Sequence, residues 1–358
     1  MTRFIIRRLL SSIPVLFGIV LLVFVLARVI PGDPCTATYG EKATPELCAQ
    51  FEIRYGLDKP IYEQFVIYVG AIAQGDLGSS IKFGRPVTDL LLERLPVTLE
   101  LTIVALIFAS VVGITLGLLS ATRRNSPVDV LTMIVANLGV SIPVFVLGLL
   151  LAFVFAVLLK DTPFTLPPSG RLTAGVSVKP LVDAWGLTAL EGPPRAILDF
   201  ASNMYVFNTL VTGQWSALAD ALKHLILPAI AVGTIPLAII ARMTRSSLLE
   251  VLGLDYVRTA RAKGLKERSV VIRHGMRNAL LPVVTVIGLS LGAFLSGAIL
   301  TETIFNLTGM GKTLFEAIEG RDYIVIQGVT IVVALAYLIV NLVVDVSYAL
   351  LDPRIRLG

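Results

Sequence analysis

Residues 255–282 read DYVRTARAKGLKERSVVIRHGMRNALLP, and no other part of the chain is as basic. The stretch contains seven Lys and Arg residues and two acidic residues, in a chain that is 55% hydrophobic and 15% charged. A long run without charged side chains follows it directly. Basic segments beside long apolar runs are typical of the cytoplasmic loops of membrane proteins.

The composition is also that of a membrane protein. Mean hydropathy is +0.84 over 358 residues, which is too apolar for a soluble globular domain. A helix needs about 20 apolar residues to cross the hydrocarbon core. We therefore expect an all-α polytopic membrane protein with six transmembrane helices, in the nearly uncharged segments 9–30, 97–120, 130–159, 222–240, 279–300 and 324–351.

The N-terminal segment MTRFIIRRLL resembles the basic start of a secretory signal peptide. The apolar run that follows is longer than the core of a typical signal peptide, and no small-residue cleavage site comes after it. We expect residues 1–30 to be a short cytoplasmic N-terminus and a retained first transmembrane helix.

The distribution of Lys and Arg predicts the orientation, because basic loops remain in the cytoplasm. Acidic residues are in the majority in one set of loops, roughly 31–96, 160–223 and 301–323. Basic residues far outnumber acidic ones in the other set, which comprises residues 1–8, 121–129, 241–278 and 352–358. We therefore expect both termini and the basic loop to be cytoplasmic.

Two interpretations fit the basic loop. It can be a simple anchor that touches anionic lipid. The residues favour a more ordered structure, because 255–263 have a helix-forming composition, Gly264 interrupts them and a helical pattern restarts at Lys266. Glycine permits a positive φ or the close approach of another backbone. Two short helices that meet at Gly264 would form a rigid knob, which a lipid anchor does not need.

Segments along nearly the whole chain resemble one family. YVRTARAKGL (256–265), RHGMRNALLP (273–282) and LLDPRIR (350–356) are similar to the cytoplasmic loop and tail of the oligopeptide/dipeptide (peptide/nickel-type) ABC-transporter permeases. SIPVFVLGLLLAF, HLILPAIAVG and ETIFNLTGMGKTLFEAI resemble later blocks of these binding-protein-dependent inner-membrane components. The resemblance implies the type I ABC importer permease fold with an extracytoplasmic loop subdomain, in the inner membrane of a prokaryote.

The loop motif of ABC importers is Glu-Ala-Ala, three residues and Gly. Here Ala260 and Gly264 occupy the last alanine and the glycine, while Arg258 and Thr259 replace the first two residues, as is usual in the peptide branch. The resemblance implies that loop 247–278 docks on a cytoplasmic ATPase. Its coupling residues would be Tyr256, Arg258, Thr259, Ala260, Arg261, Ala262, Lys263, Gly264 and Leu265.

The implied function is that of the permease subunit of an ATP-driven importer of di- and oligopeptides. The implied partners are a second permease, two ATPases that bind ATP and Mg²⁺, an extracytoplasmic binding protein and membrane lipid, without nucleic acid. We expect no cofactor in this chain. Nickel, glutathione and oligosaccharides remain alternative substrates. A secondary transporter, the other class considered, would show internal repeats and intramembrane acids or broken helices in mid-span, and the sequence indicates neither.

The chain is not expected to be an enzyme. GMGKT at 309–313 imitates the end of a phosphate-binding loop, but the full pattern requires glycine where Asn306 stands. The motif also follows a predicted membrane helix instead of a strand. His224 and His274 stand alone, and the sequence shows no metal-ligand spacing or nucleophile–base cluster.

The loop 31–96 is expected to form an extracytoplasmic cap. Thr44 and Pro45 are typical of a helix start, Gly56 of its end and Pro60 of a second start. Cys35 and Cys48 both fall in this loop, and an oxidising compartment predicts a disulfide between them; two free thiols are the alternative. The insertion 160–220 is Pro- and Gly-rich, and we assign it no role.

The permease core is expected to cover residues 97–351. Within it, Asn137 and Ser141 precede Pro143, which would leave a backbone carbonyl unpaired nearby. These two side chains are therefore candidates for a translocation path, with hydrogen bonding between helices as the alternative. The tail 352–358 would complete the chain in the cytoplasm.

Overall fold

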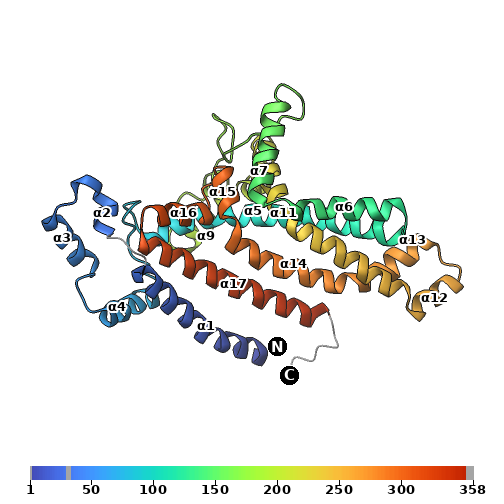
Figure 1. Cartoon of the computed structure of the whole chain (residues 1–358), viewed down its shortest axis with the longest axis horizontal. Helices are drawn as coiled ribbons and strands as arrows, with labels where there is room; N and C mark the ends of the chain where they lie inside the picture. The colour runs from blue at the N-terminus through green and yellow to red at the C-terminus, as the bar shows by residue number, and fades with distance from the viewer. Residues whose placement is uncertain (1, 30–33, 352–358) are drawn as a thin grey trace.

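The computed structural model describes residues 2–29 and 34–351, and these residues form a helical molecule (Figure 1). The predicted tail 352–358 lies outside the described residues. The β-structure within the described residues is one isolated antiparallel bridge between Ser79 and Pro86. The helices are α1 (Thr2–Val29), α2 (Pro34–Tyr39), α3 (Pro45–Tyr55), α4 (Ile61–Ala73), α5 (Val87–Thr122), α6 (Pro127–Ser141), α7 (Val144–Phe153), α8 (Leu181–Ala184), α9 (Pro193–Ser202), α10 (Tyr205–Thr212), α11 (Trp215–Leu252), α12 (Asp255–Ala262), α13 (Glu267–Ser269), α14 (Arg277–Gly297), α15 (Ile299–Ile304), α16 (Met310–Glu319) and α17 (Tyr323–Leu351).

Five helical segments of the described chain are long and apolar enough to cross a membrane, and a bent pair of helices makes a sixth. The five are Ile6–Leu26, Val87–Thr122, Trp215–Leu252, Glu267–Phe294 and Tyr323–Val344. The all-α membrane fold is thereby confirmed. Two helices extend well beyond the predicted spans, because α5 begins at Val87 instead of residue 97 and α11 covers far more than 222–240.

The third span is not the single crossing predicted for 130–159. Instead, α6 and the segment Val144–Leu158, which comprises α7 and the π-helical turn η2 (Val154–Leu158), meet at an angle of 103°. The residue before the proline, Ile142, is extended, with φ −101° and ψ 128°. Pro143 disfavours helical backbone at the preceding residue and has no N–H to continue the helix, so the chain breaks here.

α11 forms the centre of the bundle and packs against α5, α6 and α14. Two glycines on α5 allow its backbone to lie close to that of α11. A Cβ atom at Gly117 would lie 2.6 Å from the Ala241 carbonyl oxygen, and one at Gly113 would lie 2.9 Å from that of Leu237. Real Cβ contacts are not so short, so the glycine spacing sets the distance between these two backbones.

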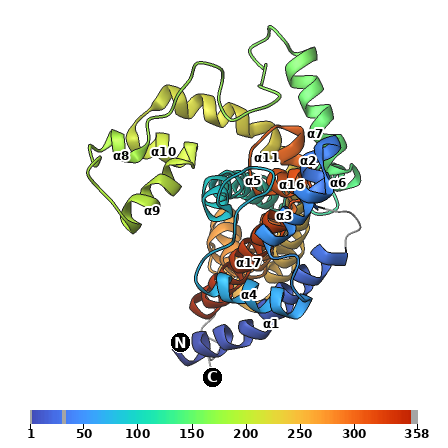
Figure 2. The ribbon, with the colours of Figure 1, turned by 90° about the vertical axis from the view of Figure 1, so that its left-hand side faces the viewer.

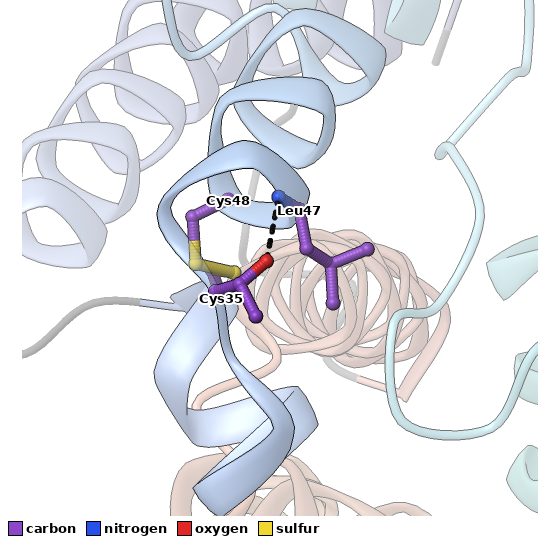
Figure 3. Close-up of a disulfide and its surroundings, with 4 residues drawn as sticks. Cys35, Leu47 and Cys48 are labelled. Carbon is purple, nitrogen blue, oxygen red and sulfur yellow. Dashed lines mark hydrogen bonds between the residues drawn. A yellow bond between two sulfur atoms is a disulfide. The ribbon is translucent and has the colours of Figure 1, made fainter.

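The cap forms as the local sequence predicts. The Thr44 hydroxyl accepts a hydrogen bond from the Leu47 N–H at the start of α3, and Gly56 ends that helix with φ 64°. Pro60 precedes the start of α4. A disulfide joins Cys35 to Cys48, with the two Cα atoms 5.5 Å apart (Figure 3).

The insertion projects from one side of the bundle as α8, α9 and α10 (Figure 2). A buried carboxylate attaches it. Glu100 on α5 accepts hydrogen bonds from the Arg171 guanidinium, at 3.0 Å, and from the Val206 N–H at the start of α10. Arg171 also stacks on the Tyr205 ring, 3.6 Å from its centroid. The insertion is therefore fixed to a membrane helix by a paired, hydrogen-bonded charge.

Candidate functional site

The basic loop forms the knob that its sequence predicts, at the end of the molecule opposite α2, α3 and α16 (Figure 1). Its first helix, α12, buries one face. Val257 is 0% exposed and Ala260 is 7% exposed, and both pack against Val270 in the π-helical turn η3 (Val270–Met276). Val251 and Leu252 from the end of α11 complete this small core. The spacing of Val257 and Ala260 is that of one helix face.

Gly264 ends α12 in a left-handed conformation, with φ +75°. The Gly264 N–H donates to the Arg261 carbonyl at 2.9 Å, and the Leu265 N–H donates to the Ala260 carbonyl at 3.4 Å. This pair of bonds is the Schellman arrangement, which satisfies the last carbonyls of a helix. A Cβ atom at Gly264 would meet no other atom within 4 Å, so the glycine is required here for its backbone conformation.

Polar contacts join α12 to the segments that follow it. The Arg261 guanidinium binds both carboxylate oxygens of Glu267, at 3.1 and 2.7 Å. The Tyr256 hydroxyl accepts a hydrogen bond from Asn278 on α14, at 2.7 Å, and donates to the His274 carbonyl, at 3.2 Å. Because Arg261 is already paired, it contributes less free positive charge to the surface than the sequence alone indicates.

The remaining predicted coupling residues form the exposed surface of the knob. Arg258, Thr259, Ala262, Lys263 and Leu265 are all exposed. Leu265 is 42% exposed, and Leu254, which the sequence analysis did not select, is 46% exposed. The surface thus combines apolar side chains with Lys and Arg. Ala260 belongs to the buried face instead.

The knob is packed rigidly onto two membrane helices. In η3 and the start of α14, Val271, Met276 and Ala279 are buried against Leu248 of α11. A Cβ atom at Gly275 would lie 3.0 Å from the Leu248 side chain, so this turn lies close to α11. α12 is therefore connected to both membrane helices, because it packs on η3 and the end of α11, and η3 in turn leads into α14.

The predicted path residues Asn137 and Ser141 lie on one groove between α6 and α11, which we call the α6–α11 groove. It consists of two adjoining cavities of about 650 and 590 Å³ that share Met133, Asn137 and Arg245. The first cavity also contacts Ser141, and the second contacts Arg242 and Ser246. Both predicted side chains currently bond within their own helix, Asn137 to the Met133 carbonyl and Ser141 to the Asn137 carbonyl.

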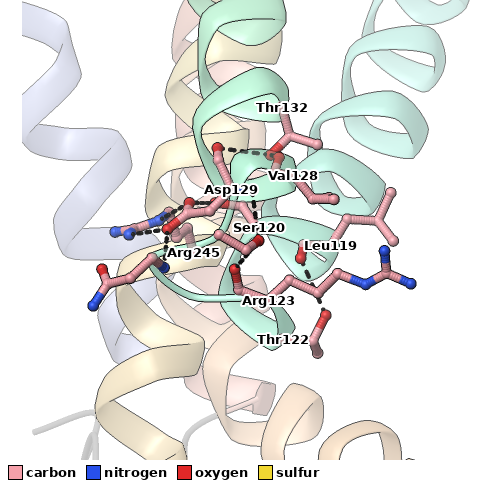
Figure 4. A network of polar contacts seen from close by, with 10 residues as sticks. Leu119, Ser120, Thr122, Arg123, Val128, Asp129, Thr132 and Arg245 are labelled. Carbon is pink, nitrogen blue, oxygen red and sulfur yellow. Dashed lines mark hydrogen bonds and ion pairs between the residues drawn. The ribbon is translucent and has the colours of Figure 1, made fainter.

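An ion pair that the sequence analysis missed lines one part of this groove, with Asp129 buried and Arg245 half-buried (Figure 4). The Asp129 carboxylate on α6 binds the Arg245 guanidinium on α11 at 2.9 and 2.8 Å. It also accepts hydrogen bonds from the Ser120 hydroxyl and the Asn125 N–H. The pair joins residues 116 positions apart, so no local pattern could have revealed it.

The GMGKT segment forms the start of α16, and its N–H groups are engaged by a protein carboxylate. Glu302 is fully buried and accepts hydrogen bonds from the Lys312 N–H, at 2.9 Å, and from the Thr98 hydroxyl, at 2.6 Å. A Cβ atom at Gly309 would lie 2.5 Å from a Glu302 carboxylate oxygen. Burial raises the pKa of Glu302 to about 7, although its hydrogen bonds act in the opposite direction. The glycines therefore make room for Glu302.

Comparison with known proteins extends these observations. A family model described as the binding-protein-dependent transport system inner membrane component matches residues 113–357, and a model of the corresponding N-terminal region matches residues 1–102. The dipeptide transport system permease protein DppB of Alkalihalophilus pseudofirmus is 44% identical over 356 residues, covering 99% of this chain and 100% of the relative.

Two further relatives cover the chain to the same extent. The di/tripeptide transport system permease protein DppB of Pseudomonas aeruginosa is 45% identical over 357 residues, 99% of each chain. The glutathione transport system permease protein GsiC of Escherichia coli is 38% identical over 356 residues, again 99% of each chain. The similarity therefore extends over nearly the whole length of the chain.

Proposed function

The chain belongs to the family of binding-protein-dependent transport system inner membrane components, and we propose that it is the permease subunit of an ATP-driven importer of dipeptides and short oligopeptides. The family is a membrane permease component of ABC importers, which agrees with the helices long enough to cross a membrane. The peptide substrate is supported by relatives with 44% and 45% identity whose names state dipeptide and di/tripeptide transport.

We propose that the knob, which comprises α12, Gly264, α13 and η3, carries the surface that docks on an ATPase. The supporting observation is its dual character: the outer face is exposed and carries Leu254, Leu265 and basic side chains, while the inner face is packed on α11 and α14. A partner that binds the outer face and moves would tilt two membrane helices. Binding can shift the balance of transporter states only through different affinities for those states.

We propose a complete transporter of this permease, a second and similar permease, two ATPases and an extracytoplasmic binding protein. In this assembly the distribution of Lys and Arg favours a cytoplasmic location for the knob and for both termini. The C-terminal ends of α11 and α17 then lie on the same side of the membrane. ATP and Mg²⁺ bind to the ATPases in this proposal. The cap and the insertion, at the opposite end, would face the binding protein.

Glutathione is a second candidate substrate. It is supported by the relative named as a glutathione transport permease, which is 38% identical. Its lower identity places it behind dipeptides, which the 44% and 45% relatives favour.

The test is transport by the reconstituted assembly. Vesicles that contain this permease with its partner permease and ATPases would be supplied with binding protein, internal ATP and labelled dipeptide or glutathione. We expect dipeptide uptake that requires both ATP and binding protein. Uptake of glutathione without dipeptide would support the second candidate, and uptake that persists without the ATPases would refute the proposed mechanism.

A further inference from the structure

The α6–α11 groove carries features of a ligand site that the proposed function leaves unassigned. Its polar side chains do not belong to the knob, the cap or the insertion. Asn137 and Ser141 lie one turn apart on α6, and Arg242 and Ser246 lie one turn apart on α11. Polar side chains within membrane-spanning helices are costly and mark functional sites when they face a cavity.

One end of the groove carries an available positive charge. Arg245 is paired with Asp129, so these two charges balance. Arg242 lines the same cavity, is exposed and has no ion-pair partner among the residues that the structure describes. An exposed guanidinium presents several N–H donors and binds carboxylates in a bidentate manner.

The other end of the groove carries partial negative charge. α6 ends at Ser141, and Ile142 and Pro143 do not continue it. The last carbonyls of a helix lack partners within it and form the negative end of its dipole. Pro143 cannot donate a hydrogen bond to them. Non-helical backbone within a broken membrane span is tolerated where it lines a polar cavity, and in transporters such carbonyls bind cations.

We propose that the α6–α11 groove binds a zwitterionic peptide, with its carboxylate on Arg242 and its ammonium group on the carbonyl end of α6. The neutral amide of Asn137 lies between them and meets the peptide bond. α6 and α11 run antiparallel, because Asp129 pairs with Arg245 and a Cβ atom at Gly139 would meet Thr234, so Arg242 lies level with about residue 132 of α6. From that level to Ser141 is about 14 Å along α6. The Arg242 side chain, which tilts toward the N-terminus of α11, covers about half of this distance, and an extended dipeptide of about 7 Å covers the rest. The proposal rests on the proposed function, since it assigns a binding site for the same substrate class.

The test measures the binding of peptides to the purified transporter. The binding protein is left out, because it selects peptides by itself and would mask a preference of the groove. Saturation-transfer NMR would compare dialanine, its C-terminal amide and its N-acetyl derivative. We expect wild type to prefer dialanine over the amide by roughly tenfold, as loss of a hydrogen bond to a charged group predicts. Arg242→Gln should abolish that preference and leave the amide bound as before.

Two further variants keep the result specific. Arg7→Gln removes a basic residue from α1, away from the groove, and should preserve the preference. Pro143→Ala supplies an N–H that competes for a helix-end carbonyl, so it should reduce discrimination against the N-acetyl derivative and spare discrimination against the amide. Equal loss of all three ligands in Arg242→Gln, or equal binding of all three to wild type, would overturn the proposal.

Dipeptide uptake by the same preparation separates this proposal from the proposed function. If wild-type vesicles import dipeptide with binding protein and ATP, but the groove shows no preference for the zwitterion, only the groove proposal fails. If wild-type vesicles import no peptide, the proposed function fails.

Discussion

Substitution of Gly264 provides a sharp test of the knob, because the structure separates backbone strain from steric clash. The residue has φ +75°, and a Cβ atom there would meet nothing within 4 Å. In Gly264→Ala, strain at this left-handed position costs about 1–2 kcal/mol. That cost lowers the ratio of folded to unfolded knob by a factor of about 5–30. We expect uptake to fall while basal ATP hydrolysis persists.

Two other substitutions at this position make the interpretation specific. Gly264→Asn should retain more uptake than Gly264→Ala, since asparagine tolerates the left-handed region better. Gly264→Leu should show the same uptake as Gly264→Ala if backbone strain is the whole effect. Its uptake should be lower than that of Gly264→Ala if an ATPase surface lies close to this position.

The assay is uptake and binding-protein-stimulated ATP hydrolysis in reconstituted vesicles, with subunit stoichiometry measured in each sample. Arg258→Ala serves as the control, because its side chain is 71% exposed and its ion pair with Asp255 contributes only about 0–1 kcal/mol. Wild-type uptake by both Gly264→Ala and Gly264→Leu, at normal stoichiometry, would refute the reasoning.

Further predictions address the remaining parts of the molecule. Single cysteines at Arg261 and Lys82, in a background without native thiols, should react with an impermeant reagent from opposite sides of the membrane; labelling from one side would refute the orientation. Intact-mass analysis should show two additional protons after reduction of the Cys35–Cys48 disulfide, and alkylation of both thiols without reduction would contradict it. Gly309→Ala should lower Tm, since its Cβ would lie 2.5 Å from a Glu302 carboxylate oxygen, whereas Gly18→Ala, with no atom within 4 Å, should lower it far less; equal effects would contradict the close packing of Gly309 on Glu302. Because the pKa of Glu302 is raised to about 7 in the folded protein, wild type should lose stability relative to Glu302→Gln as pH rises from about 5 to 7, and parallel pH profiles would contradict the buried acid.

The local backbone features were predictable from the sequence. Thr44, Gly56 and Pro60 mark the ends of the cap helices, and Gly264 marks the end of α12. Each depends on the conformational preference of a single residue, which acts within a few positions. Long apolar runs likewise reveal the membrane helices, since the requirement for about 20 apolar residues is set by the bilayer.

Features that depend on distant residues could not be predicted in the same way. Val257 is buried because Val270 and the end of α11 cover it, and the basic residues around it obscure this role. Glu302 is buried because α16 folds back on it. The apolar run 130–159 predicts a single crossing although it contains Pro143, because the 103° bend also depends on where α7 packs, against α11 and α15. Tertiary packing decides such positions.

Covalent cross-linking would test most directly whether the knob docks on an ATPase. Ala262 is exposed on α12, so Ala262→Cys, with Cys35 and Cys48 replaced by serine, presents one thiol on the proposed docking surface. In the assembled transporter, a short bifunctional reagent should join this thiol to an ATPase subunit, with a yield that changes when nucleotide binds. Lys82→Cys, at the opposite end of the molecule, should give no such product. A fully assembled transporter in which Ala262→Cys reacts with the reagent but never cross-links to an ATPase would contradict the proposed coupling surface.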